Sequence, residues 1–228
     1  MFICAVWNSS KKSNQMLVQS PSKIFKSDLS VWRKENSCVL NEMIPDEQSG
    51  LHKITEVVFE ENGTFDFNYQ KSSTVLIIVL FGEIFINDFE KPVSPEHIFT
   101  LKSEEDNTLN IRNNTPDEKA DILIFELKSI KKDNFFSIEN LNIDRRNHLI
   151  QISEKLEYPN FIGLYEGRKE EEYSLHQKGK SIFGMVINGA FEFQNRLLET
   201  RDAIIISEIE TLEFEALSEN ALLLFFEV

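Results

Sequence analysis

The sequence predicts an all-β protein made of two closed barrels in tandem, and three observations support this prediction. Apolar and polar residues alternate with a period of two in several segments, which is the pattern of strands with one buried face. Residues 74–81 form a continuous, β-branched apolar run, which is typical of a strand covered on both faces. A block of strands and turns recurs at a spacing of about 101 to 107 residues, too long for a solenoid and suited to two copies of one β domain.

The alternation is clearest in residues 64–70, where Phe65, Phe67 and Tyr69 alternate with polar residues. Residues 83–87 and 190–194 behave in the same way. The dipeptides at 62–63 and 188–189 are both Asn-Gly, which favours hairpin turns because both residue types tolerate positive φ. These segments predict a chain that is predominantly β.

The repeat preserves the order of its parts. An apolar strand is followed by a Gly turn, an alternating strand, an acidic turn, a further strand, a Thr-Leu strand and a closing apolar strand that ends in Glu plus an aliphatic residue. Gly82 corresponds to Gly189, Thr108 to Thr211, and Glu126 to Glu227. A unit of seven or eight short strands has to close on itself, because open sheet edges promote aggregation.

The repeat divides the chain into three parts. We expect a first barrel with an N-terminal extension in residues 1–130, a crossover linker in 131–160 and a second barrel in 161–228. Trp7 and Trp32 predict that part of the extension packs on the first barrel, and its role is otherwise open.

Composition excludes several classes of function. The net charge of −14 repels phosphate backbones, so we expect no nucleic-acid partner. The longest strongly apolar run is too short to span a bilayer, the N-terminus is a poor signal peptide, and we expect no membrane association. Cys4 and Cys38 are too few for a disulfide framework. A cytoplasmic protein with free thiols is the expectation.

Each block of the repeat resembles a cupin barrel, and two in tandem resemble a bicupin. The later block is similar to the carboxy-terminal barrel of pirin-like proteins, the group that includes bacterial quercetin 2,3-dioxygenase homologues. The resemblance covers residues 50–228 and implies two jelly-roll barrels. The matching segments are 79–84, 95–98 and 110–116 in the first block, and 182–195, 202–204, 211–212 and 221–228 in the second.

The resemblance also implies a metal, usually iron, held in the first barrel by an H-x-H pair and by a later His and Glu two residues apart. Aligned without gaps through Gly82, the four positions are occupied by Asn68, Gln70, Leu109 and Ile111. A one-residue slip gives Tyr69 and Lys71 in place of the first two. None of these is a ligand that iron, copper or zinc prefers, so we predict no metal and no cofactor.

The remaining ionisable residues form no recognisable site. His52, His97, His148 and His176 lie far apart, and we expect His176 to be a surface or capping residue. The acidic runs 104–106 and 170–172 are expected to be solvated turns rather than paired catalytic carboxylates. We therefore predict no catalytic residue.

Three functions stay open. The leading prediction is a non-catalytic pirin-like bicupin that binds a small molecule or a protein partner. The alternative implied by the resemblance is a quercetin 2,3-dioxygenase-like enzyme with a divergent metal site for iron or another divalent ion. A third prediction uses Asn68, Gln70 and Asn113 to orient a carbonyl or sugar ligand inside an otherwise apolar first barrel. The aromatic stripe of this barrel predicts either a filled core or a pocket for a small apolar or aromatic ligand, and it comprises Phe65, Phe67, Phe85, Phe99 and Phe125.

Overall fold

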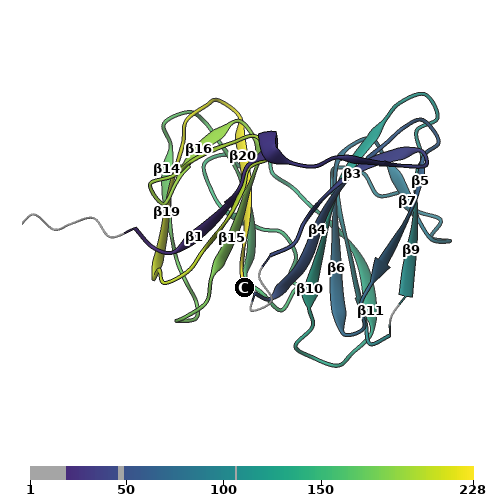
Figure 1. The fold of residues 1–228 in the computed structure, drawn as a ribbon, viewed down its shortest axis with the longest axis horizontal. Coiled ribbons are helices and arrows are strands. Elements are labelled where there is room, and N and C mark those ends of the chain that lie inside the picture. The colour runs from purple at the N-terminus through teal and green to yellow at the C-terminus, as the bar shows by residue number, and fades with distance from the viewer. Residues whose placement is uncertain (1–18, 46–48, 106) are drawn as a thin grey trace, which may run out of the picture.

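The computed structural model describes residues 19–45, 49–105 and 107–228, and it consists of two β-sandwich barrels that lie side by side (Figure 1). Each barrel packs one large sheet against one small sheet. The large sheets have the strand orders β11-β8-β6-β10-β4-β3-β2 and β1-β18-β15-β20-β13-β12, and the small sheets have the orders β5-β9-β7 and β14-β19-β16-β17. The predicted all-β, two-barrel architecture is confirmed.

The strands of the first barrel are β2 (Arg33–Glu35), β3 (Cys38–Met43), β4 (Leu51–Phe59), β5 (Thr64–Tyr69), β6 (Ser73–Phe81), β7 (Ile84–Ile86), β8 (His97–Ser103), β9 (Asn107–Asn113), β10 (Ala120–Lys128) and β11 (Phe135–Asn140). The strands of the second are β1 (Ser22–Phe25), β12 (Ile150–Gln151), β13 (Asn160–Tyr165), β14 (Glu170–Ser174), β15 (Ile182–Asn188), β16 (Ala190–Phe193), β17 (Leu197–Glu199), β18 (Ala203–Ile206), β19 (Thr211–Ala216) and β20 (Ala221–Glu227). A single 3-10 turn, η1 (Ser27–Leu29), is the helical element of the described residues, and none of them forms a helix with the length and apolarity to cross a bilayer.

The internal repeat corresponds to equivalent strands in the two barrels. β10 pairs with both β4 and β6, and β20 pairs in the same way with β13 and β15. Gly82 and Gly189 both have positive φ (+75° and +80°) in the turn after the central strand. A Cβ atom at either position would lie 2.9 Å or less from a neighbouring atom, so the turn requires glycine on two counts.

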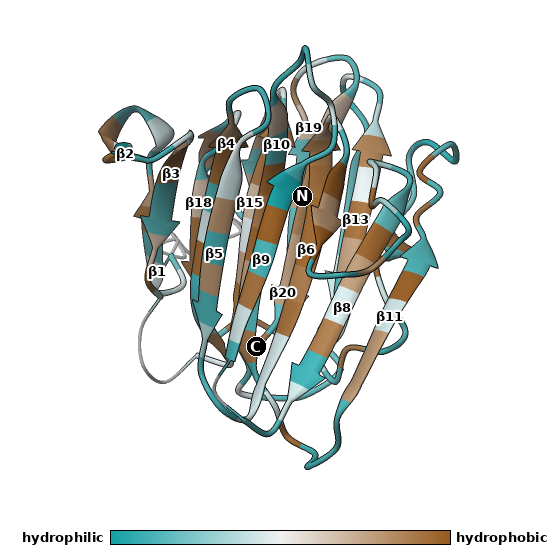
Figure 2. Cartoon of the chain, turned by 90° about the vertical axis from the view of Figure 1, so that its right-hand side faces the viewer, coloured by the Kyte–Doolittle hydropathy of each residue, from teal (hydrophilic) through white to brown (hydrophobic). Residues whose placement is uncertain are grey.

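Strand β6 is covered on both faces, as its continuous apolar sequence predicts (Figure 2). Val75, Ile77 and Val79 point into the first barrel and belong to its core. Leu76 and Ile78 point the other way and pack in a core shared by the two barrels. The two large sheets therefore face each other across a dry layer of side chains.

Phe125 lies in the middle of this shared layer. Its ring centroid is 4.9 Å from that of Phe226 and 6.2 Å from that of Phe183, both from the second barrel. All three side chains are fully buried. Phe125, which the sequence places in an aromatic stripe of the first barrel's interior, instead joins the barrels because its neighbours Ile124 and Glu126 take the inward positions of β10.

The two barrels divide the chain differently from the expected boundaries. β1, at the N-terminus, pairs with β18 of the second barrel, and β11, inside the expected linker, pairs with β8 of the first. Figure 1 shows the purple segment that leaves β1 and crosses to the first barrel. Trp32 lies on this crossing segment and is 43% exposed, and Trp7 lies outside the described residues.

We predict that Phe125→Ala lowers the free energy of unfolding by about 3–5 kcal/mol, because it opens a cavity in the layer between the barrels. The matched control is Phe81→Ala, since the Phe81 side chain is 53% exposed and its loss should cost about 1 kcal/mol or less. Urea unfolding of both variants measures the difference. Equal losses of unfolding free energy in the two variants would contradict the role of Phe125 in the layer between the barrels.

Candidate functional site in the barrel interiors

The inward face of β5 is aromatic. Phe65, Phe67 and Tyr69 are buried, whereas Asn68 and Gln70 are exposed. Asn68 accepts a hydrogen bond from the Thr108 hydroxyl (2.7 Å) on the outside of the small sheet. The prediction that Asn68 and Gln70 lie in the barrel interior is therefore wrong. The ungapped alignment places the expected ligands one residue out of phase with a strand whose side chains alternate.

The other two expected positions do face the interior. Leu109 and Ile111 on β9 are buried, and their Cα atoms lie opposite Phe67 and Phe65. The one-residue slip considered for β5 places Tyr69 inside and leaves Lys71 exposed in the turn. In either alignment, the inward positions of β5 and β9 carry aromatic and aliphatic side chains.

Asn113 has a structural role. Its amide donates hydrogen bonds to the Glu60 and Glu118 carbonyl oxygens (3.2 and 2.6 Å), and its carbonyl oxygen accepts the Thr115 N–H (2.8 Å). The side chain thus satisfies three backbone groups at the end of β9. It has no free polar atom to turn toward a ligand in the barrel.

Side chains fill the interior of the first barrel. Phe59, Phe67 and Phe99 are at most 1% exposed, and the core around them is closed by aliphatic residues from six strands. Of the two outcomes open to a small barrel, a filled core and a ligand pocket, the structure has the filled core.

A buried carboxylate ends the closing strand of each barrel. Glu126 accepts hydrogen bonds from the Gln70 N–H (2.7 Å) and the Ser73 hydroxyl (3.0 Å), and the Lys53 ammonium lies 3.9 Å away. Glu227 accepts the His176 and Gln177 N–H groups (2.9 and 2.8 Å). These two residues are the repeated Glu pair of the sequence. Each binds backbone donors of the turn that enters the central strand, a role that the repeat alone did not reveal.

The second barrel adds two tyrosines that donate to carboxylates. The Tyr173 hydroxyl donates to Glu227 (2.8 Å) and contacts Nδ1 of His176 (2.6 Å), while Tyr165 donates to Glu171. Burial and the adjacent carboxylates raise the pKa of both phenols. Both tyrosines are therefore hydrogen-bond donors at neutral pH and not nucleophiles. The His176 ring is 59% exposed, as expected for a capping residue.

The residues of the first barrel do not fit a metal ion. The described residues contain no group of three or more His, Cys, Asp or Glu side chains arranged to hold one. His97 contacts the Ser94 hydroxyl (2.8 Å), and burial lowers the pKa of His52. The iron that the family resemblance implies therefore finds no ligand set at the expected positions.

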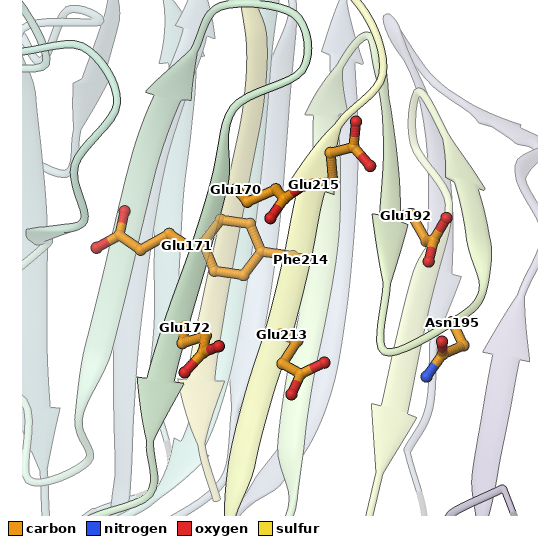
Figure 3. A pocket seen from close by; sticks show the side chains of 8 residues that line it. All are labelled: Glu170, Glu171, Glu172, Glu192, Asn195, Glu213, Phe214 and Glu215. Atoms are coloured by element: carbon orange, nitrogen blue, oxygen red, sulfur yellow. The ribbon is translucent and has the colours of Figure 1, made fainter. Parts of the chain in front are cut away.

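The outer face of the second barrel is acidic (Figure 3). It forms a shallow hollow of about 490 Å³ lined by Glu170, Glu171, Glu172, Glu192, Asn195, Glu213, Phe214 and Glu215. The run 170–172 is strand β14 and not the turn expected from the sequence, because every residue from 170 to 174 pairs with β19. Glu171 points away from the other glutamates in Figure 3, toward Tyr165. The run 104–106 is partly described, with its last residue outside the described part.

Comparison with known proteins places this geometry in a fold family. Residues 159–228 match the family model described as the quercetinase C-terminal cupin domain. No curated protein sequence matches the chain. Solved structures match along most of its length.

The bacterial pirin YhhW from Escherichia coli, in complex with nickel(II), has a TM-score of 0.77 at 12% identity, over 91% of this chain and 99% of that one. A quercetin 2,3-dioxygenase from Acinetobacter baumannii has a TM-score of 0.67 at 9% identity, over 90% of this chain and 78% of that one. The protein YhaK from Escherichia coli has a TM-score of 0.65 at 14% identity, over 91% and 94%. The resemblance to the pirin-like bicupin fold is confirmed, and activity has to be argued from the residues.

We predict that Glu227→Gln lowers the free energy of unfolding by about 2 kcal/mol, because an amide offers one acceptor oxygen where the carboxylate offers two to buried donors. Glu192→Gln is the matched control. Glu192 is exposed beside other glutamates, so its neutralisation should be neutral or slightly stabilising. Urea unfolding distinguishes the two, and an equal change in both variants would count against the turn-binding role of Glu227.

Proposed function

We propose that this protein is a pirin-like bicupin that works without a metal centre, as a non-catalytic protein-interaction module. The observation that carries the proposal is the inward face of β5 and β9, where Phe65, Phe67, Leu109 and Ile111 occupy the space that a metal site requires. Imidazole and carboxylate ligands with open coordination positions are the basis of metal-dependent oxygen chemistry in barrels of this type.

The filled interior also favours a protein partner over a small ligand. A small-molecule pocket buries most of its ligand in a concave, largely apolar cavity, and the aromatic side chains of the first barrel occupy that volume. The chain's negative charge and the acidic face of the second barrel argue against a nucleic-acid partner. We place the protein in the cytoplasm, where the buried free thiol of Cys38 stays reduced.

Metal analysis tests the proposal. Protein purified without chelator should contain substoichiometric iron, nickel and copper by mass spectrometry, because its interior supplies no ligands. A stoichiometric metal in the wild-type protein would overturn the proposal.

A pair of designed variants tests which side chains of β5 point into the first barrel, on which the prediction of no bound metal depends. The inward variant combines Phe67→His, Tyr69→His, Leu109→His and Ile111→Glu, and it should gain nickel binding because all four side chains point into one barrel. The control combines Asn68→His and Gln70→His with the same two β9 substitutions. It should gain none, since two of its imidazoles point outward.

The alternative function is a flavonol-cleaving dioxygenase, favoured by the description of the family model that matches residues 159–228. We predict no cleavage of quercetin by the wild-type protein after addition of Fe(II), Ni(II) or Cu(II), measured as loss of flavonol absorbance. Metal-dependent turnover that survives replacement of Asn68 and Gln70 by Ala would establish the enzyme and locate its site away from those exposed residues.

A further inference from the structure

An ion cluster lies where the two barrels meet the N-terminal crossing segment. Arg201, in the turn between β17 and β18 of the second barrel, directs its guanidinium at two carboxylates of the first. Its Nε lies 2.8 Å from Glu56 on β4, and one Nη lies 3.0 Å from Asp121 on β10. The other Nη donates to the Ile187 carbonyl (3.0 Å), which holds the fork in place. We call Arg201, Glu56 and Asp121 the junction cluster.

The junction cluster has one more negative than positive group when all three are ionised. Glu56 is 3% exposed, and the Asp121 side chain is 19% exposed. One oxygen of Asp121, Oδ1, is buried without a hydrogen-bond partner. A buried carboxylate with an unmatched charge or an unbonded oxygen is costly, and the cost disappears when the carboxylate binds a proton.

The described residues that lie beside the cluster in sequence or in strand register are already paired or uncharged. Lys26 of the crossing segment pairs with Asp202 and Glu199 (2.5 and 3.6 Å), which flank Arg201 in sequence. On β3, Asn41 faces Glu56 in register, and its amide donates to the Ser30 hydroxyl (3.3 Å). On β10, the register partner of Glu56 is apolar Leu123.

We propose that the junction cluster is a proton-linked latch between the two barrels. With one proton bound by Glu56 or Asp121, the cluster is neutral and the barrels are held together. With both carboxylates ionised, the contact carries an uncompensated buried charge and loosens. This inference is independent of the proposed function, because it concerns the joint between the barrels and not their interiors.

The direction of the pH dependence follows from the pKa shifts. Burial raises the pKa of Glu56 from 4.5 to about 7, against the opposing effect of Arg201, and burial also raises the pKa of Asp121. At a pH between 4.5 and about 7, the folded protein therefore holds a proton on Glu56 that the unfolded chain has released. The unfolding free energy falls as the pH rises through this window, and the loss is complete above the folded pKa.

Urea unfolding of the full chain at about pH 5.5 and about pH 8 tests the latch. Between these two pH values, the unfolding constant should rise at least about tenfold more for the wild-type protein than for Glu56→Gln, since one pKa unit corresponds to a factor of ten. The comparison with the variant removes the contribution of His52, whose lowered pKa acts in the opposite direction in both proteins. Asp121→Asn provides a second variant in case the first fails to fold. An equal pH dependence in the wild-type protein and the variants would overturn the proposal.

Glu157→Gln is the matched control. Glu157 lies in the segment between the barrels and pairs with the buried Lys102 (2.9 Å). Burial acts to raise the pKa of Glu157. The hydrogen bonds from Lys102 and two backbone N–H groups outweigh this effect and hold the pKa below its usual range. Glu157 thus stays ionised throughout the window, and its variant should be destabilised while it keeps the wild-type pH dependence.

Hydrogen exchange separates a latch from a general loss of stability. Protection factors in β15, which faces the first barrel, should fall at the higher pH relative to those in β14 and β19 on the outer face. In Glu56→Gln, the ratio of the protection factors in β15 to those in β14 and β19 should be the same at both pH values. An equal fall in the inner and outer strands of the wild-type protein would contradict the latch.

Discussion

Burial of each large sheet on both faces is the constraint on which the rest of this structure depends. One face of β6 and β10 packs inside the first barrel, and the other packs against the second barrel through Phe125. A sheet in this position needs apolar side chains at nearly every residue of its central strands. It also leaves little room for polar groups, so the buried charges are confined to strand ends and to the joint between the barrels.

The same constraint explains which parts of the fold were predictable from sequence. The apolar run at 74–81 and the repeated Gly turns indicated doubly covered strands and two copies of one domain, and these features are local. The pairing of β1 with the second barrel, and the inclusion of β11 in the first barrel, were not predictable. β1 is mostly exposed and β11 has no clean alternation, so neither sequence reports which sheet it completes.

The candidate site shows where alignment and periodicity conflict. Counting back from Gly82 placed the expected ligands at Asn68 and Gln70, whereas the alternation of Phe65, Phe67 and Tyr69 already placed the opposite set inside the barrel. The structure follows the alternation, because burial of three aromatic rings outweighs any gain from two uncharged amides. Leu109 and Ile111 were placed correctly because their apolar character agrees with both criteria. The role of Glu126 and Glu227 needed coordinates, since their backbone partners are 56 and 50 residues away in sequence.

The pairing of β1 with β18 has a consequence for the order in which the chain folds during synthesis. β1 is made before the strands of the first barrel, yet it completes a sheet whose other members are made after that barrel, and domains otherwise tend to fold in order from the N-terminus. The first barrel can assemble while β1 waits, with its backbone donors and acceptors still solvated. β1 is already available when β18 is made, so it can pair with the open edge of β18, which would otherwise be a template for unwanted strand addition.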